Sequence, residues 1–195
     1  MKRIFDIVVS FLGLLVLSPL LIFCSLAILL GDGFPVFFRQ VRVGRKGQSF
    51  WLLKFRTMSV QKGTEKGAFD AGCSARVTRV GSKLRKTKLD ELPQLWNVLK
   101  GDMSLVGPRP EVRKWVDEYP EHWAIVLHVR PGITDQASMM FRNEEEILAA
   151  SNQPEETYKN VILPQKLELY EEYVRTQSFL GDIKIILQTL FVLFK

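Results

Sequence analysis

The chain has 195 residues, with 27 lysines and arginines against 21 aspartates and glutamates, and a formal net charge of +6. This length allows one domain with a substantial core and argues against two full domains. The basic balance favours an anionic partner, which nucleic acid, a lipid surface or a phosphorylated small molecule would satisfy. His122 and His128 have no cysteine or acid at metal-ligand spacing, which argues against a zinc site.

The first apolar run, residues 7–30, contains no charged side chain and is long enough for a helix to cross the apolar part of a bilayer. We therefore predict a membrane anchor over residues 1–34 and a cytosolic domain over residues 35–195. A cleaved signal peptide is the first alternative, but the apolar run continues past the small-residue site at 25–27.

Ser18 and Pro19 stand in the middle of this run, and proline removes a backbone donor and clashes with the preceding turn. Basic residues flank both ends of the run: Lys2, Arg3, Arg39, Arg42, Arg45 and Lys46. By the positive-inside tendency, both ends prefer the cytoplasmic face. A re-entrant helix hairpin broken at Ser18-Pro19 satisfies both observations, and a kinked spanning helix is the alternative.

The two cysteines do not suggest a disulfide, because Cys24 lies in the apolar run and Cys73 in the polar stretch 59–75, which we expect to be a loop. A reducing setting for the globular part fits this usage. At the other end, residues 179–195 are strongly apolar with sparse charges. They predict an interfacial helix, with a buried core helix as the alternative.

The middle of the chain predicts an α+β fold that is mainly helical. Two β-rich runs, 36–43 and 49–58, are joined by a glycine-containing turn and indicate a β-hairpin. Helical patterns cover residues 78–88, 115–129 and 164–177.

Two adjacent acids, Asp90 and Glu91, follow a basic run and precede Pro93. On local grounds the stretch favours a helix start, with either Thr87 or Asp90 as the capping residue and Gly101 as the C-terminal stop. A helix cap is the ordinary explanation for such an acid, so the local pattern alone does not indicate an active site.

Arg109 stands between Pro108 and Pro110. The prolines stiffen the backbone and prepare the guanidinium to bind a phosphate or a base edge. A rigid turn without a binding role is the alternative.

Several stretches stand out along the chain: KRIFD, the central Ser18-Pro19, KFRTM, LRKTKLDELPQLWNVLKGDMSLVGPRPE, RPGIT and SFLGDIKII. Together they resemble the bacterial sugar transferase family, the monotopic polyprenyl-phosphate phosphoglycosyl transferases, nearly from end to end. The chain is similar to the small form of this family, which consists of the membrane anchor and the catalytic domain. The resemblance also supports the re-entrant hairpin, with Ser18 and Pro19 at its break.

The resemblance implies transfer of a sugar 1-phosphate from a nucleotide diphosphate sugar, usually UDP-linked, to a polyprenyl phosphate such as undecaprenyl phosphate. Nucleoside monophosphate would leave, and assembly of a capsule, exopolysaccharide, lipopolysaccharide or glycoprotein glycan would begin. The site would face the cytoplasm at the bacterial inner membrane. We expect no nucleic-acid partner, and the sugar, the glycan pathway and a homodimer are left open.

By the same resemblance, Asp90 is the nucleophile that forms a phosphosugar-aspartyl enzyme, and Glu91 is its acidic partner. The resemblance implies that both acids bind Mg²⁺. A carboxylate and a diphosphate repel each other, and the metal ion, a helix N-terminus and nearby cations would offset this repulsion. The matching positions imply a phosphate contact for Arg85, a nucleotide contact for Pro108, Arg109 and Pro110, and substrate cations at Lys54, Arg56 and Arg142.

After RPGIT the chain reads DQASMMFR, where many members continue with Gly and an Ala-Gln-Val-x-Gly-Arg pattern. This departure leaves the roles of Asp135 and Gln136 unassigned.

A non-enzymatic, membrane-anchored module that binds anionic lipid or nucleic acid is the alternative from another class. It explains the net charge but not Asp90 and Glu91 among cations. A different membrane glycosyl transferase, which would release nucleoside diphosphate, is the third reading.

Overall fold

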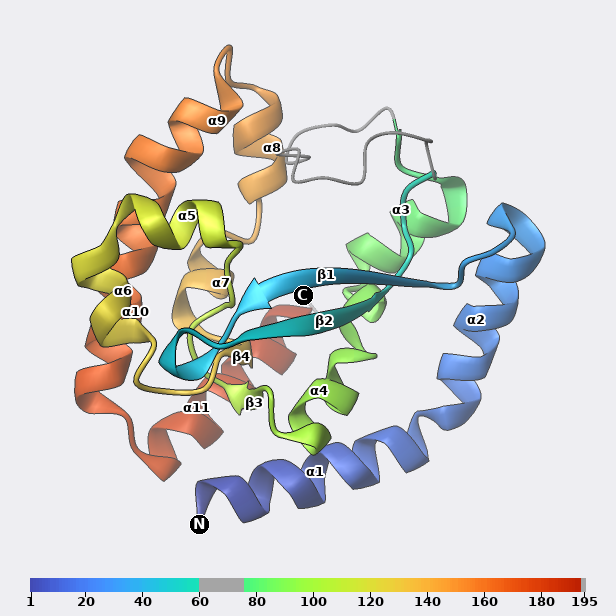
Figure 1. The fold of residues 1–195 in the computed structure, drawn as a ribbon. Coiled ribbons are helices and arrows are strands. Elements are labelled where there is room, and N and C mark those ends of the chain that lie inside the picture. Colours follow the sequence, from blue (N-terminus) through green and yellow to red (C-terminus); the bar gives the residue numbers. More distant parts are fainter. Residues whose placement is uncertain (60–75, 194–195) are drawn as a thin grey trace.

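The computed structural model describes residues 1–59 and 76–193, and these form helices around two small two-stranded sheets (Figure 1). The α+β, mainly helical prediction is confirmed. The elements in chain order are α1 (Lys2–Val16), α2 (Ser18–Asp32), β1 (Phe37–Val43), β2 (Ser49–Phe55), α3 (Arg79–Lys86), α4 (Gln94–Lys100), β3 (Ser104–Val106), α5 (Arg113–Glu118), α6 (Pro120–Val126), β4 (Gly132–Thr134), α7 (Gln136–Met140), α8 (Glu144–Ala149), α9 (Pro154–Thr157), α10 (Leu163–Thr176) and α11 (Phe179–Leu193). Most of the expected loop 59–75, with Cys73, lies outside the described residues.

The predicted break of the N-terminal apolar run is confirmed, because α1 and α2 meet at a bend of 60° at Ser18 (Figure 1). Pro19 has no amide hydrogen to donate to the carbonyl of Leu15, and the Ser18 hydroxyl donates to that carbonyl instead, at 2.7 Å. Among the described residues, no single helix is long and apolar enough to cross a membrane, whereas the bent pair passes by length and composition.

The start of α1 is fastened to the globular part by polar side chains. Asp6 is buried and accepts a hydrogen bond of 2.8 Å from the Ser104 hydroxyl on β3. Lys2 forms an ion pair of 2.5 Å with Asp182 on α11. Arg3 donates to two carbonyl groups at the C-terminal end of α4. The KRIFD stretch therefore ties the anchor to β3, α4 and α11.

The β-hairpin is also confirmed. β1 and β2 are antiparallel, with Phe37 opposite Phe55. Asn97 on α4 accepts a hydrogen bond of 3.0 Å from the Leu53 amide and donates one of 2.7 Å to the Trp51 carbonyl. These two bonds hold α4 against β2, so the turn before α4 lies next to the end of the hairpin.

The strands β3 and β4 are parallel, and just beyond β3 the chain passes very close to RPGIT. A Cβ atom on Gly107 would lie 2.5 Å from the Arg130 carbonyl oxygen, and one on Gly132 would lie 2.1 Å from the Gly107 nitrogen. Both positions therefore require glycine. The Gly132 amide donates to the Pro108 carbonyl at 2.9 Å, which fixes the start of the Pro-Arg-Pro loop.

One helix prediction needs correction. The segment 115–129 forms two helices, α5 and α6, because Pro120 forces Tyr119 out of helical geometry, at φ −132° and ψ 61°. The predicted helices at 78–88 and 164–177 are confirmed as α3 and α10. α10 packs on α6 and buries Trp123 and Tyr170 in the larger core cluster.

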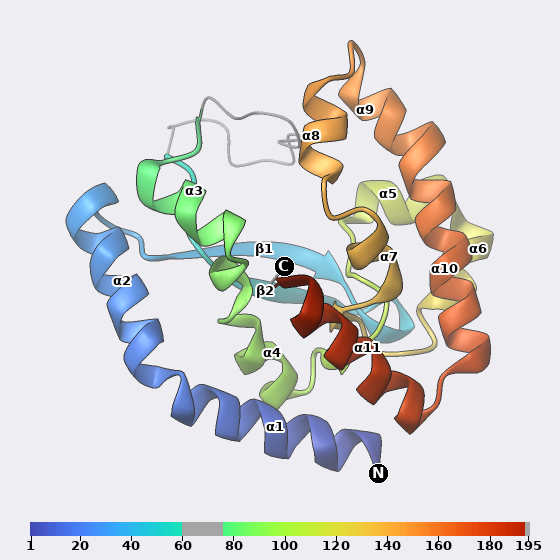
Figure 2. The same ribbon diagram turned by 180° about the vertical axis from the view of Figure 1, so that it is seen from behind.

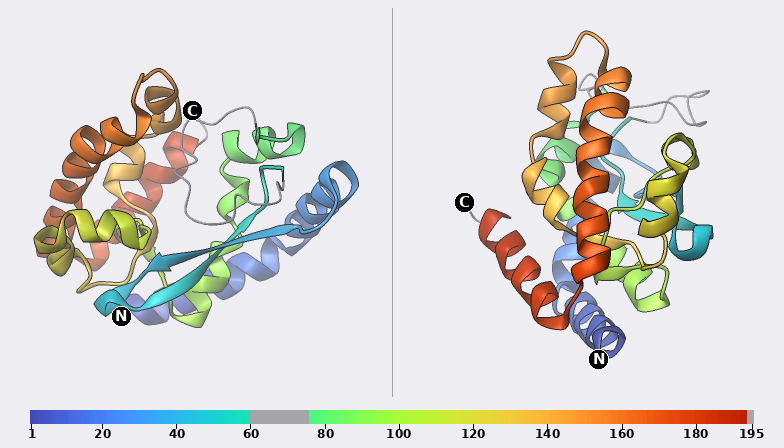
Figure 3. Two further views of the ribbon diagram at one scale, coloured as in Figure 1. Left: turned by 45° about the horizontal axis from the view of Figure 1, so that its top comes forward. Right: turned by 90° about the vertical axis from the view of Figure 1, so that its left-hand side faces the viewer.

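The last helix, α11, is not the fully buried core helix of the alternative prediction. Asp182 and Ile185 are buried on one side, and the opposite side leaves Leu180, Leu187 and Phe191 exposed. Figure 2 and the right-hand view of Figure 3 show the first turn of α11 close to the N-terminal end of α1. The rings of Phe5 and Phe179 join the two helices in an edge-to-face contact of 5.3 Å. Further large apolar side chains are exposed on α1 and α2: Ile4, Val8, Phe11, Leu12, Leu15, Val16, Ile22, Phe23, Leu26 and Leu30.

Candidate active site

The two adjacent acids lie in a short 3₁₀ turn, Leu89–Glu91, between α3 and α4. Lys88 has the left-handed φ of 56° and ends α3, and the Thr87 hydroxyl donates back to carbonyls of that helix. No side chain caps α4, which begins at Gln94. The prediction that Thr87 or Asp90 caps the following helix is therefore wrong, and capping does not explain why an acid stands at position 90.

Glu91 is held by two cations from distant parts of the chain. The Lys54 ammonium on β2 lies 2.9 Å from Oε1 of Glu91. Arg109, in the Pro-Arg-Pro loop, donates to Oε2 at 3.2 Å and also to Oε1. Burial would raise the pKa of Glu91, but Arg109 and Lys54 outweigh burial and hold this pKa well below its usual range. Glu91 is thus a fixed anion.

Asp90 is in a different state, although it is the next residue. Its side chain is buried, with 7% of the residue exposed, and Oδ1 has no hydrogen-bond partner among the described residues. Burial raises the pKa of Asp90, and Glu91 raises it too, against the opposing effects of Lys54, Lys88 and Arg109. A poorly solvated carboxylate oxygen beside cations, without a partner of its own, is suited to attack an electrophilic phosphorus.

Two further groups lie within electrostatic range of Arg109. The charge of Glu91 is the main cause that raises the pKa of Arg109 well above its usual value, and the charges of Asp135 and Tyr170 add to this rise. Asp135 is buried and accepts hydrogen bonds from the amide and hydroxyl of Ser138, at 2.8 and 2.6 Å. The Tyr170 hydroxyl is buried and has no hydrogen-bond partner among the described residues. The site therefore includes Asp135, whose role the sequence left open, and Tyr170, which sequence reasoning missed.

Three of the basic residues that the resemblance assigned to phosphate or substrate do not join this cluster. Arg56 is buried and donates from its two terminal nitrogens to the carbonyl groups of Asp32, Gly33 and Phe34, at 2.7 to 2.8 Å, where α2 ends. Arg85 pairs with Glu145 of α8 at 2.7 Å. Arg142 is exposed in the turn before α8. The structure thus brings together Lys54, Asp90, Glu91 and Arg109, with Pro108 and Pro110 buried on either side of the arginine.

Comparison with known proteins identifies the class of the chain. The family model described as "Bacterial sugar transferase" matches residues 1–195. The chain belongs to this bacterial sugar transferase family.

Three relatives are each 38% identical to the chain. They are an uncharacterized sugar transferase, EpsL, of Bacillus subtilis, and UDP-glucose:undecaprenyl-phosphate glucose-1-phosphate transferases of Escherichia coli and Caulobacter vibrioides. The alignments cover 97%, 98% and 96% of this chain, and 85%, 39% and 67% of the respective relatives. The chain thus spans about two fifths of the Escherichia coli protein.

Proposed function

We propose that this chain transfers a sugar 1-phosphate from a UDP-sugar to undecaprenyl phosphate and releases UMP. The names of two relatives support the substrate classes, and the family match favours an enzyme over a binding module. The observation that carries the proposal is the contrast between neighbouring acids. The charge of Glu91 is balanced by Lys54 and Arg109, while Asp90 keeps a buried oxygen that has no partner in the described part of the chain.

In the first step, an Asp90 oxygen attacks the β-phosphorus of the UDP-sugar. A bond forms between that oxygen and phosphorus, and the bond from phosphorus to the bridging oxygen breaks. UMP leaves with the electron pair, and the sugar phosphate stays on Asp90 as an acyl phosphate. The raised pKa of Asp90 makes its ionised form more basic than an exposed aspartate, which favours attack.

In the second step, a phosphate oxygen of undecaprenyl phosphate attacks the same phosphorus. A new diphosphate bond forms, the bond to Asp90 breaks, and the carboxylate is regenerated. No net proton is gained or lost by Asp90 over the two steps. Lys54 and Arg109 would balance the charge of the entering phosphates, and Glu91 holds both cations beside Asp90.

We include Mg²⁺ in the proposal, held by Asp90 and the substrate phosphates. The described residues contain no group of three or more His, Cys, Asp or Glu side chains that could hold a metal ion. Mg²⁺ usually takes only one or two carboxylates together with phosphates and water, and the Asp90 carboxylate, whose Oδ1 has no partner among the described residues, would supply one of them. Both Glu91 oxygens already contact cations, so we place Glu91 beside the ion. When bound, Mg²⁺ would neutralise charge on the diphosphate.

The membrane placement follows from the apolar surfaces. We propose that α1 and α2 enter and leave the inner leaflet from the cytoplasmic side, as a hairpin over residues 1–34, with α11 lying at the interface. The exposed apolar side chains of these three helices support this placement, as do the basic residues on both flanks of the bent pair. The site in residues 35–195 would then face the cytoplasm, at the membrane surface where the phosphate of undecaprenyl phosphate lies.

The test is an assay of nucleotide release with the full chain, undecaprenyl phosphate and a panel of UDP-sugars. We expect UMP as the product with at least one sugar, and release only when Asp90 is intact. UDP as the product would instead identify a glycosyl transferase of another kind. Salt-sensitive lipid binding without release of nucleotide from any UDP-sugar would favour the binding module.

A further inference from the structure

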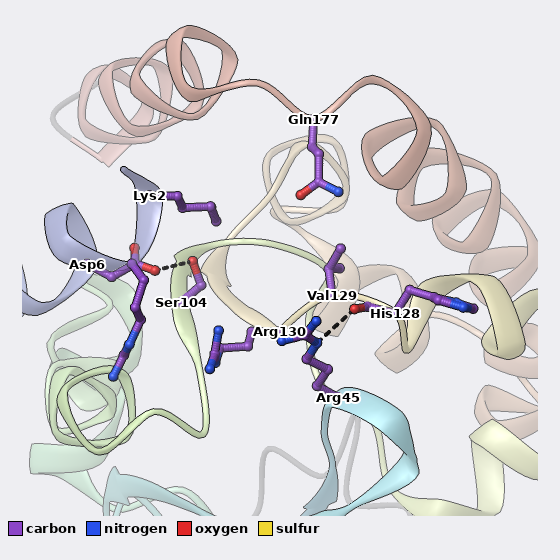
Figure 4. A pocket seen from close by; sticks show the side chains of 9 residues that line it. Lys2, Asp6, Arg45, Ser104, His128, Val129, Arg130 and Gln177 are labelled. Carbon is purple, nitrogen blue, oxygen red and sulfur yellow. Dashed lines mark hydrogen bonds between the residues drawn. The ribbon is translucent and has the colours of Figure 1, made fainter.

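A cavity of about 260 Å³ lies away from the Asp90 cluster, beside the start of α1. Figure 4 shows its lining side chains arriving from α1, the hairpin turn, the segment before β4 and the connection between α10 and α11. The lining residues are Lys2, Arg3, Asp6, Arg45, Ser104, His128, Val129, Arg130 and Gln177. None of them belongs to the Asp90 cluster, so the cavity is a separate feature.

The arginines of this cavity are held in position by backbone carbonyl groups. Nε of Arg130 donates to the Gly101 carbonyl at 2.9 Å, and Nε of Arg45 donates to the His128 carbonyl at the same distance. Neither bond uses the terminal nitrogens of the guanidinium. Each of these arginines therefore keeps terminal donors for another partner.

The positive charge of the cavity is poorly balanced. Arg3, Arg45 and Arg130 form no ion pair with an acid in the part of the chain that the structure describes. Burial lowers the pKa of Arg130, and the charges of Arg3 and Arg45 lower it further. Asp6 is the acid in the lining, and its oxygens already accept from the Ser104 hydroxyl and the Leu105 amide. The cavity thus gathers three arginines that form no ion pair among the described residues, with the charge of Asp6 only partly opposing the lowered pKa of Arg130.

The elements that line the cavity also carry exposed apolar residues. Ile4 on α1 and Leu180 on α11 are 69% and 79% exposed, and both follow closely after lining residues, Arg3 and Gln177. The start of α1 therefore contributes both to the cavity and to the apolar surface of α1, α2 and α11, which puts the cavity at an edge of that surface. In a membrane, this edge is where lipid phosphates meet the aqueous phase.

We propose that this cavity binds the phosphate of an anionic phospholipid, with Arg45 and Arg130 as the main ligands and the acyl chains lying on α1 and α11. Guanidinium groups bind phosphate oxygens in pairs, with shorter and stronger hydrogen bonds than neutral donors make. The cavity is smaller than the roughly 300–1,000 Å³ of typical ligand pockets, which suits a headgroup better than a whole nucleotide sugar. This inference rests on the membrane placement proposed above. It is independent of the chemistry at Asp90.

The test is native mass spectrometry of the full chain released from detergent micelles, titrated with short-chain phosphatidylglycerol, phosphatidylcholine or inorganic phosphate. The variant is the double substitution Arg45→Gln and Arg130→Gln. The control, Arg113→Gln with Arg175→Gln, removes the same charge from two surface arginines whose side chains are 52% and 67% exposed. Arg45→Gln alone serves if the double variant does not fold, because Arg45 is exposed on the hairpin turn.

We expect the wild type and the control to retain phosphatidylglycerol in preference to phosphatidylcholine. The double variant should bind phosphatidylglycerol about tenfold more weakly or worse, with UMP release unchanged when detergent-soluble substrates are saturating. If the control binds phosphatidylglycerol as weakly as the double variant, the effect depends only on net charge and the proposed phosphate site is wrong. Inorganic phosphate that binds as tightly as phosphatidylglycerol would overturn the assignment to a lipid. Failure of UMP release in every variant, with lipid binding as expected, would contradict the proposed function and leave the lipid site standing.

Discussion

Arg109 holds the carboxylate of Glu91 with both terminal nitrogens of its guanidinium, although one residue lies in the turn before α4 and the other in the loop after β3. A guanidinium has five N–H donors, and this pairing leaves donors on Arg109 for a phosphate. Glu91 can therefore orient Arg109 while the guanidinium keeps N–H donors that can bind a substrate phosphate. The arrangement is ready before a substrate binds, which avoids reorganisation of the site during the reaction.

The first prediction concerns this pair. Arg109→Ala should lower kcat/KM for the UDP-sugar about 10- to 100-fold, because a charge-assisted contact of roughly 1.5–3 kcal/mol is lost. Arg109→Lys should restore only part of the activity, since an ammonium group lacks the planar set of donors with which a guanidinium binds a carboxylate and a phosphate at once. Steady-state rates with wild type, both variants and the surface control Arg113→Ala provide the measurement. Equal rates in wild type and Arg109→Ala would remove Arg109 from the site.

The second prediction separates catalysis from stability at Asp90. Asp90→Asn should abolish transfer, because the amide has no anionic oxygen. Its melting temperature at pH 7 should equal or exceed that of the wild type. Asp90 caps no helix, and its raised folded-state pKa means that the ionised carboxylate destabilises the folded protein above the pKa of the unfolded chain. Loss of activity together with a clear drop in melting temperature would indicate a structural role instead.

The covalent step has its own test. Wild-type chain incubated with UDP-sugar labelled in the sugar phosphate, without undecaprenyl phosphate, should retain label on Asp90, and the kinetics should be ping-pong. Asp90→Asn should retain none. Label on another residue, or sequential kinetics with no labelled protein, would contradict the two-step mechanism.

The third prediction concerns pH. Only ionised Asp90 attacks, and its pKa is raised, so the acid limb of kcat/KM should lie above the usual aspartate value of 3.8. Lys54 opposes this rise. Lys54→Met should therefore move the acid limb to higher pH, while Lys54→Arg, which keeps the charge, should leave it near that of the wild type. A limb that moves to lower pH in Lys54→Met would contradict the assignment of Asp90.

Local sequence signals account for the parts of the fold that were predicted. Proline at position 19 marks the bend, and Gly101 ends α4 with the left-handed φ of 106° that glycine adopts freely. The missed features depend on contacts distant in sequence. Nothing in a lysine predicts the left-handed φ of Lys88 that puts Asp90 into a separate turn. Tyr170 occupies a buried position on α10 and resembles an ordinary core residue in the sequence, and only the folded chain brings it within electrostatic range of Arg109.

Arg56 shows why a motif does not fix the use of each residue in it. Lys54 and Arg56 both belong to KFRTM, and their spacing of two would put them on one face of a continuous strand. The strand β2 ends at Phe55, however, and Arg56 turns to the carbonyl groups at the end of α2. Its place there depends on where the anchor ends, which the KFRTM stretch does not encode.

The fourth prediction concerns the attachment of the anchor. Asp182 is 3% exposed and accepts from Lys2 at 2.5 Å and from the Tyr173 hydroxyl at 2.8 Å. Asp182→Ala would remove the counter-charge of Lys2 and one partner of the Tyr173 hydroxyl, although both groups keep a hydrogen bond to the Val106 carbonyl. Because the Lys2 side chain is partly exposed, we expect a cost of roughly 1–3 kcal/mol. We expect a lower melting temperature in micelles and faster hydrogen exchange at the start of α1. An unchanged exchange rate there would show that other contacts hold α1.

The last prediction concerns topology and uses the bend at Pro19. If the bent pair is re-entrant, tags at residues 1 and 195 should both be protected from reagents outside intact cells. Pro19→Leu restores an amide donor to the Leu15 carbonyl and removes the steric clash, so a fraction of molecules should straighten α1 and α2 into one spanning helix. That fraction should expose the N-terminal tag, while Leu20→Ala, which leaves the proline in place, should not. Labelling of the wild-type N-terminal tag from outside would contradict the re-entrant placement and favour a spanning helix. Protection of both tags in Pro19→Leu would show that Lys2, Arg3 and Asp6, through their bonds to the globular part, hold the N-terminus on the cytoplasmic side even without the bend.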